Sequence, residues 1–233
     1  MSKSQSQIRH TLRAIKYKYS RLGFSESGED LIARYLMGTK KGFFVDIGAG
    51  NPVVGSNSYL FYKSGWHGVA VDPNSKLSLA WKIARPKDAF LSIAIGSQSG
   101  NAIFYEYQND LRSTISQKVH NYYETQNLVS KSSEVRIETL TYLFERFVKD
   151  EQHVFLSIDV EGQELDTLVS LDFTRFQPRL IAIENWKLPW LGENEIAKFL
   201  HANNYRLAAY SGLTAFYMKS LDLKNLLDSR PSI

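Results

Sequence analysis

The stretch from Phe43 to Asn74 constrains the fold of this chain more than any other part of its sequence. It holds an apolar run that leads into Asp46-Ile-Gly-Ala-Gly, and then a shorter apolar run that ends in Asp72-Pro73. Two buried strands with acidic ends, joined by one helix, are typical of a nucleoside-binding half of a doubly wound α/β fold. The glycines of the first turn leave room for a ligand to approach the backbone, because glycine has no Cβ.

The remainder of the chain continues this alternation of strands and helices. Apolar or alternating runs predict strands over residues 43–47, 68–71, 89–95, 102–107, 134–137, 154–158, 179–183, 205–210 and 214–218. Helical spacing predicts helices over residues 28–37, 56–64, 75–83, 139–148, 163–169 and 193–201, the first capped by Ser27. This order favours a mostly parallel sheet covered on both faces, closed by an antiparallel hairpin. Residues 108–133, rich in Asn, Ser and Gln, are expected to form a long surface loop.

The net charge of +4 is unevenly distributed along the 233 residues. Residues 1–25 carry six Lys and Arg side chains and no acid, so the net charge of the other residues is 4 minus 6, or −2. Helical spacing of apolar residues predicts a basic amphipathic arm over residues 1–23. We expect this arm to lie on the body or on a second subunit; the alternatives are an anionic membrane surface and a phosphate-bearing substrate. The slightly acidic body disfavours a nucleic-acid partner.

Several function classes are excluded or disfavoured by what the sequence lacks. It contains no cysteine, which excludes a disulfide scaffold, a thiolate zinc site and a cysteine nucleophile. No apolar run reaches the roughly 20 residues of a membrane-spanning helix, and the first ten residues lack the apolar core of a signal peptide. The sequence therefore predicts a cytoplasmic protein with one main domain over residues 24–220 and a C-terminal tail over residues 221–233.

Carboxylates end four of the predicted strands, at Asp46, Asp72, Asp159 and Glu184. Ligands of a doubly wound sheet bind outside the carboxyl ends of its strands, so we expect these side chains to surround one ligand. The dinucleotide fingerprint would need glycine at position 53, where this chain has Val53. A nucleoside without a pyrophosphate therefore fits better. S-adenosylmethionine has this form, and its ammonium group suits an acidic rim.

Several segments together resemble the FkbM-type methyltransferases. They are SESGEDLIARYL, GFFVDIGAGNPVVGSNSYLFYKSGWHGVAVDP, AIGSQSG, IETL and LSIDVEGQELDTLVSLDF, and the resemblance covers residues 24–218. VDIGAG alone indicates only the broad class, whereas its combination with IDVEGQE and the following Leu-Asp-Phe is specific. The resemblance implies a class I methyltransferase fold, which is Rossmann-like and doubly wound, with a mostly parallel seven-stranded sheet and an antiparallel C-terminal hairpin strand. It also implies S-adenosylmethionine as the cofactor and a hydroxyl oxygen of a sugar, glycan or polyketide as the acceptor.

The resemblance assigns cofactor contacts to individual positions. It implies that the methionine end is lined by Asp46, Gly48, Ala49, Gly50, Asn51 and Asn57. It further implies that Asp72 and Pro73 hold the ribose and that Ala94 and Ile95 lie near the adenine. The segment over residues 25–30 would close over the cofactor through Glu26, which stands where the family has an amide.

Removal of the proton from an acceptor hydroxyl calls for a general base, and carboxylates are the best candidates. Asp159 and Glu161 are two residues apart, so strand alternation directs both to one side, and Glu184 is expected on the neighbouring strand. Such a group either supplies a base with a raised pKa or shares a divalent cation such as magnesium through Asp159 and Glu184. Both alternatives stay open, with the base preferred. Glu164 and Asp166 are expected to be acids at a helix start that face water.

Candidate acceptor contacts are Ser113, Thr114 and His120 in the predicted loop, and Trp186 and Lys187 after the strand over residues 179–183. His120 is also a candidate base, and Trp186 is placed where its ring could form the bottom of a sugar-binding site. The resulting hypothesis is an S-adenosylmethionine-dependent O-methyltransferase that acts on a carbohydrate hydroxyl, in a sugar nucleotide or a surface-glycan sugar. The alternatives are an O-methyltransferase of a polyketide or other small molecule, an RNA methyltransferase, a nicotinamide oxidoreductase and a non-catalytic binding module.

Overall fold

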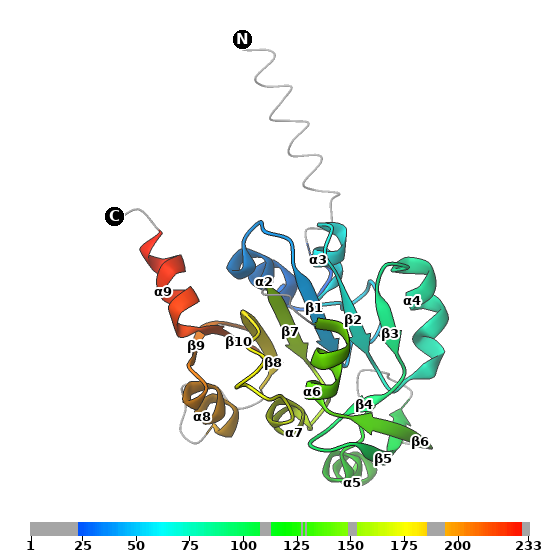
Figure 1. Cartoon of the computed structure of the whole chain (residues 1–233). Helices are drawn as coiled ribbons and strands as arrows, with labels where there is room; N and C mark the ends of the chain where they lie inside the picture. The colour runs from blue at the N-terminus through cyan, green and yellow to red at the C-terminus, as the bar shows by residue number, and fades with distance from the viewer. Residues whose placement is uncertain are drawn as a thin grey trace, which may run out of the picture.

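A sheet of seven strands in the order β3-β2-β1-β7-β8-β10-β9 forms the centre of the molecule in this computed structural model (Figure 1). The structure describes residues 23–107, 113–126, 128, 130–148, 153–185 and 194–229. The predicted arm up to residue 22, and the candidates Trp186 and Lys187, lie outside the described residues. The seven strands are β1 (Phe43–Ile47), β2 (His67–Val71), β3 (Ala89–Leu91), β7 (Val154–Ile158), β8 (Leu180–Glu184), β9 (Tyr205–Ser211) and β10 (Thr214–Lys219).

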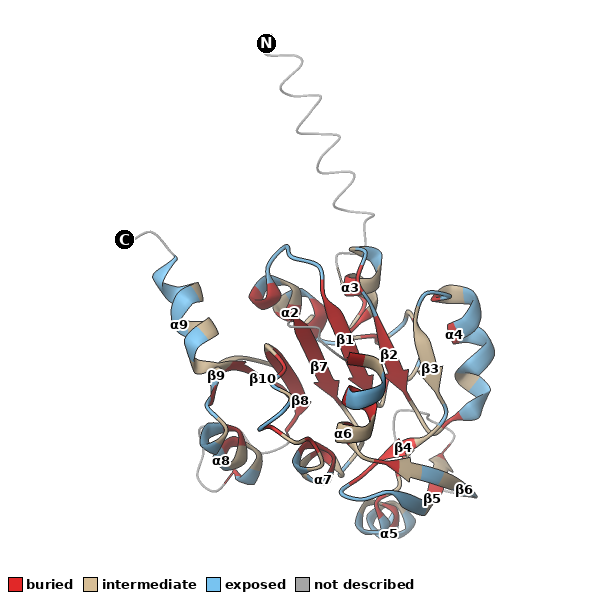
Figure 2. Cartoon of the chain, viewed as in Figure 1, coloured by how far each residue is buried: buried red, intermediate tan, exposed pale blue. Residues whose placement is uncertain are grey.

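The direction of the strands confirms the expected doubly wound arrangement. Strands β1, β2, β3, β7 and β8 run parallel, and β10 pairs antiparallel with both β8 and β9. Val45 of β1 lies in register with Val69 of β2 and Leu156 of β7. The central strands are buried along nearly their whole length (Figure 2). Their continuous apolar sequence follows from this burial on both faces.

Helices cover both faces of the sheet. They are α2 (Glu29–Met37), α3 (Tyr59–Lys63), α4 (Ser78–Ala84), α6 (Leu140–Leu143), α7 (Glu164–Val169), α8 (Glu195–Ala202) and α9 (Ser220–Asp228), with η1 (Ser75–Leu77) before α4 and η3 (Phe144–Val148) after α6. Apolar side chains of α2, α3 and α9 pack on the face that presents Phe44 and Phe155. Helices α6, α7 and α8 pack on the face that presents Val45 and Leu156.

A second, three-stranded sheet departs from the expectation drawn from the sequence. Its strands β4 (Ala94–Ile95), β5 (Gly100–Tyr107) and β6 (Ser130–Glu138) are arranged in the order β4-β6-β5. The single strand predicted over residues 89–95 is therefore two strands in different sheets, β3 and β4. The surface loop predicted over residues 108–133 is wrong where the structure describes it, because helix α5 (Gln117–Thr125) and the start of β6 lie there. Residues 131–134 of β6 are exposed, so the part of this strand before residue 135 carries no apolar pattern.

Two helices near the ends of the described chain also differ from expectation. Gly28, rather than Ser27, is the N-cap residue of α2, and the amide of Asp30 donates to Ser25 Oγ at 3.1 Å. The predicted tail over residues 221–233 is helical over most of its described part, where α9 packs Leu223 and Leu226 against the core. Among the described helices, none has the length and apolar character that crossing a bilayer would require.

Candidate active site

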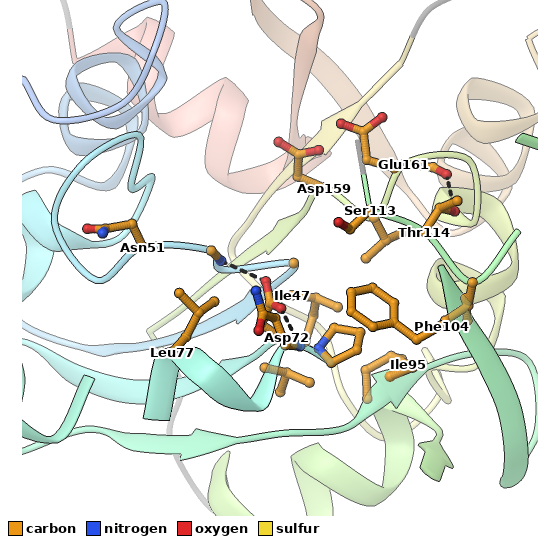
Figure 3. A pocket seen from close by; sticks show the side chains of 18 of the residues that line it. Ile47, Asn51, Asp72, Leu77, Ile95, Phe104, Ser113, Thr114, Asp159 and Glu161 are labelled. Carbon is orange, nitrogen blue, oxygen red and sulfur yellow. Dashed lines mark hydrogen bonds between the residues drawn. The ribbon is translucent and has the colours of Figure 1, made fainter. Parts of the chain in front are cut away.

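A cavity of about 620 Å³ lies at the carboxyl ends of β1, β2 and β7 (Figure 3). Small-molecule sites are typically about 300–1,000 Å³, so this cavity is large enough for a nucleoside cofactor. One end of the cavity is apolar and is lined by Leu77, Ile93, Ile95 and Phe104. Asp159 and Glu161 lie at the opposite end in the close-up view (Figure 3). The cavity therefore offers an apolar end for a flat ring and an acidic end for a cationic group.

Asp72 lines the same cavity, near Ile47 in the close-up view (Figure 3). It follows the last residue of β2, and its carboxylate accepts hydrogen bonds from the backbone N–H groups of Gly50, at 3.0 Å, and Asn74, at 2.8 Å (Figure 3). Gly50 has a φ of 52°, and a Cβ placed on it would meet no atom within 4 Å. The Gly50 turn is therefore open toward the cavity. Asp72 stands where a carboxylate that receives two ribose hydroxyls is expected.

The structure explains the glycine at position 48 differently from the sequence, which assigned it to close approach of a ligand. Gly48 has a φ of 74°, and a Cβ placed on it would lie 1.6 Å from the carbonyl oxygen of Asp159. Glycine is needed here because the end of β1 packs directly against the chain that leaves β7, and not only because a ligand approaches. The close approach places Asp159 beside the glycine turn. Trp81 holds the same turn from below through a 2.9 Å hydrogen bond from Nε1 to the carbonyl oxygen of Gly50.

Asp46 does not lie where the sequence placed it. It is buried within β1 and is not among the residues that line the cavity. Alternate residues of a strand point to opposite faces, so Asp46 points to the same face as Phe44. Its carboxylate accepts a hydrogen bond from Ser58, and burial raises the pKa of Asp46. Through its contact with Ser58, Asp46 holds the end of the loop over residues 51–58 against β1.

Arg85 supports the same loop and was missed by the sequence analysis. The buried guanidinium donates from Nε to Asp88 at 2.7 Å, and from Nη1 to Ser58 Oγ at 2.9 Å and to the carbonyl oxygen of Pro52 at 3.4 Å. It also lies 4.3 Å from the ring centroid of Trp81. A buried charge needs such partners, because desolvation of an unpaired ion is costly. One Arg among the 28 basic side chains gives no sequence signal of this role.

We expect Arg85→Lys to lower thermal stability, because an ammonium group cannot reproduce the guanidinium's separate contacts with Asp88, Ser58 and Pro52. Loss of one or two such hydrogen bonds costs about 1–2 kcal/mol, which corresponds to a decrease in Tm of about 2–8 °C for a domain of this size. Arg175→Lys is the matched control, since Arg175 makes an exposed ion pair with Glu145. Equal Tm values for the two variants, measured by calorimetry, would contradict the role assigned to Arg85.

A smaller cavity of about 220 Å³ adjoins the first one, with which it shares Gly48, Gly50, Asn51, Asp159 and Glu161 among other lining residues. Five carboxylates line it, on Glu26, Glu29, Asp159, Glu161 and Glu184, and its described lining residues include no Lys or Arg. Carboxylate oxygens of Asp159, Glu161 and Glu184 lie within 4.8 Å of one another. The expectation that strands β7 and β8 bring Asp159 and Glu184 together agrees with their parallel pairing.

The electrostatic surroundings of Asp159 favour its protonated form. Burial, followed by the negative charge of Glu184, raises the pKa of Asp159 well above its usual value. Glu164 adds to this effect and does not face water as the sequence suggested. Its Oε1 accepts hydrogen bonds from the amides of Val160, at 3.3 Å, and Gly162, at 2.9 Å. Glu164 thus closes the turn that carries Asp159, and burial raises the pKa of Glu164 as well.

The remaining candidates divide between those that line a cavity and those that do not. Glu26, Ala49, Asn51, Asn57, Pro73, Ala94, Ile95, Ser113 and Thr114 line the larger cavity, the smaller one or both. His120 is not among the lining residues. It is buried on α5, where its Nδ1 is 2.7 Å from the hydroxyl of Tyr107 and its ring stacks on Tyr105 at 3.7 Å between centroids. His120 therefore packs α5 onto the small sheet. Leu77, Ile93 and Phe104 are lining residues that the sequence analysis did not single out, because apolar residues of this kind read as ordinary core.

Comparison with known proteins gives one family match. A family model described as the methyltransferase FkbM domain matches residues 46–207. The chain is also similar to the crystal structure of methyltransferase FkbM from Methylobacillus flagellatus KT, with 12% sequence identity and a TM-score of 0.48. That similarity covers 84% of this chain and 48% of the other, so this chain spans about half the length of that protein. No curated protein matches the chain.

Proposed function

The chain belongs to the FkbM methyltransferase family, and we propose that it is an S-adenosylmethionine-dependent O-methyltransferase that acts on a carbohydrate hydroxyl. The observation that carries this proposal is the junction of the two cavities. The larger one has a nucleoside-like arrangement of groups around Asp72, and the smaller one holds Asp159, Glu161 and Glu184. Cofactor and acceptor would therefore meet at Asp159, which lines both cavities.

The residues of the larger cavity fit S-adenosylmethionine. Ile93, Ile95 and Phe104 offer apolar contacts to adenine, and Asp72 would accept hydrogen bonds from the ribose hydroxyls. Glu26 and Asp159 lie at the end where the ammonium group of the methionine portion would be held. When bound, S-adenosylmethionine supplies an electrophilic methyl group.

The carboxylates of the smaller cavity supply the proton chemistry. An alcohol is a weak nucleophile until its proton is removed, and general-base catalysis contributes about 10²–10⁴-fold. Asp159 would accept this proton, because burial and Glu184 raise its pKa and so make its carboxylate a stronger base than an ordinary Asp. Glu184 and Glu161 would orient the acceptor by accepting hydrogen bonds from its other hydroxyls. A divalent cation held by Asp159 and Glu184 is the alternative way to activate the acceptor.

The charge of the smaller cavity bears on the choice of acceptor. A cavity with five carboxylates repels a phosphate, whereas the neutral ring of a sugar can donate its hydroxyl protons to them. A surface-glycan sugar therefore suits the cavity better than a sugar nucleotide, whose diphosphate would have to stay outside it. In either case, the hydroxyl-bearing ring is the part that enters.

A screen for S-adenosylhomocysteine formation tests the proposal. The wild-type protein is incubated with S-adenosylmethionine and a panel of glycans, sugar nucleotides and hydroxylated polyketides, with and without a chelator. We expect release of S-adenosylhomocysteine with a neutral glycan, and a weaker response to the sugar nucleotide of the same sugar. Activity only with polyketides would contradict the carbohydrate assignment, and loss of activity in chelator would replace the base with a metal ion.

A further inference from the structure

Asp159, Glu161 and Glu184 are called the acidic group here, because their carboxylates lie close together. The turn over residues 159–162, which carries two of them, has an unusual backbone. Glu161 has a φ of 53° and the following Gly162 has a φ of 100°. A left-handed conformation is uncommon for a residue with a Cβ and must be maintained by its surroundings. The conformation coincides with a position where the carboxylate of Glu161 lies near those of Asp159 and Glu184. Repulsion among these like charges favours movement of Glu161 away from the group, so something must hold it.

Thr114 contacts the strained residue directly. Its hydroxyl Oγ1 donates a 2.8 Å hydrogen bond to the carbonyl oxygen of Glu161 (Figure 3). The same Oγ1 accepts a hydrogen bond from the amide of Ser116 at 2.9 Å. Thr114 is 2% exposed, so this bond is shielded from water. A buried hydroxyl with both a donor and an acceptor contact has one defined orientation.

Thr114 is itself fixed to the small sheet. Its N–H and C=O groups bond to the carbonyl and amide of Tyr105 on β5, at 3.1 and 2.9 Å. A second contact joins the same parts, since a Cβ placed on Gly162 would lie 2.5 Å from Val119 of α5. The unit formed by β5, residues 113–116 and α5 thus packs against the turn over residues 159–162. This unit also supplies Phe104, Ser113 and Ile115 to the wall of the larger cavity.

We propose that Thr114 is a positioning residue that holds Glu161 in its left-handed conformation and so keeps the Glu161 carboxylate in the acidic group. The inference deepens the proposed methyl transfer and depends on it for its kinetic test. It assigns a function to the small sheet, which locks the acceptor-binding turn into place. Ser113 and Phe104 belong to the same unit and would contact the cofactor. Order in this wall of the cavity and order at Glu161 would therefore depend on each other.

Thr114→Val and Thr114→Ser separate this role from simple packing. Valine has the shape of threonine but lacks the hydroxyl, whereas serine keeps it. In the protein without ligand, hydrogen exchange of a peptide over residues 159–165 should be faster in Thr114→Val than in the wild type, and Thr114→Ser should restore protection. This measurement requires no acceptor. Exchange that is equal in the wild type and Thr114→Val would overturn the proposal.

A double-mutant cycle tests the kinetic consequence with an acceptor found in the screen. When Glu161 is unchanged, Thr114→Val should lower kcat about 10- to 100-fold, as expected for loss of one buried hydrogen bond at a strained residue. It should lower kcat less than about threefold in the Glu161→Gln background, because the carboxylate that Thr114 positions is already absent. Equal losses in both backgrounds would mean that Thr114 acts by another route. A wild type without methyl-transfer activity would instead refute the proposed function and leave the exchange result as the test of Thr114.

Discussion

Asp159→Asn is expected to lower turnover by about 10²–10⁴-fold, the usual contribution of a general base. Asparagine has nearly the same shape as aspartate and cannot accept the hydroxyl proton. Cofactor affinity should change far less, because Glu26 remains at the end of the cavity where the ammonium group would be held, and Asp72 and the apolar lining are unchanged. Steady-state kinetics and calorimetric titration with S-adenosylhomocysteine measure the two quantities separately.

The same substitution has a consequence for stability whose sign follows from the pKa of Asp159. A carboxyl whose pKa is raised by folding stabilises the fold below its unfolded-state pKa, and this contribution is lost as pH rises through the folded-state pKa. Burial and Glu184 raise the pKa of Asp159 well above its usual value. Wild-type activity should fall at acidic pH, because a protonated Asp159 cannot accept the hydroxyl proton. Asp159→Asn should have a higher Tm than the wild type at neutral and alkaline pH, because the variant has no buried carboxyl to ionise.

Asp166→Asn is the matched control for this pair of effects, because Asp166 lies exposed on α7. It should alter neither turnover nor the dependence of Tm on pH. Near wild-type turnover in Asp159→Asn would show that Asp159 is not the general base and that the acidic group has a structural role only. If a metal ion is responsible instead, chelator should abolish activity and added magnesium should restore it.

Asp72→Ala is expected to weaken S-adenosylmethionine binding about 30-fold or more. Two ribose hydroxyls would each lose a buried acceptor, at a cost of about 1–3 kcal/mol apiece, and every 1.4 kcal/mol is a factor of ten in affinity. The substitution also frees the amides of Gly50 and Asn74, which the Asp72 carboxylate accepts in this structure. Asp72→Asn, which retains the shape and one acceptor oxygen, should lose less affinity than Asp72→Ala.

Asp166→Ala controls for the loss of a carboxylate elsewhere on the protein, and thermal melting of each variant shows whether the fold persists. Titration calorimetry gives the affinities. An Asp72→Ala variant that is folded and binds S-adenosylmethionine as tightly as the wild type would remove Asp72 from the cofactor site. It would also undermine the orientation in which adenine lies against Ile95 and Phe104.

Much of the site was predictable because parallel strands bring their carboxyl ends to one edge of the sheet. Asp72, Asp159 and Glu184 were identified as strand-end acids, and each lines a cavity in the structure. Strand alternation likewise predicted that Asp159 and Glu161 face the same region. The two carboxylates do lie close together, but both residues follow the end of β7 at Ile158, where Glu161 has a left-handed backbone that strand alternation does not describe.

The rest was not predictable because tertiary contacts decide it. Asp46 precedes the glycine turn like a ligand-binding acid, yet a single step along β1 directs it to the other face, toward Ser58. His120 was placed in a loop, because the polar sequence of α5 hides its packing against Tyr105. Arg85 had no sequence signal, since its partners other than the nearby Asp88 come from a distant segment that it meets only in the fold.

Transfer of a ¹³C-labelled methyl group tests the central claim most directly. The wild-type protein is incubated with S-adenosylmethionine labelled at the methyl carbon and with the glycan accepted in the screen, and the product is analysed by NMR and mass spectrometry. We predict one labelled methyl group bonded to a sugar oxygen, and no such product with Asp159→Asn in the same time. A label bonded to nitrogen or carbon, or its complete absence from every acceptor despite tight cofactor binding, would contradict the assignment of this site to O-methyl transfer.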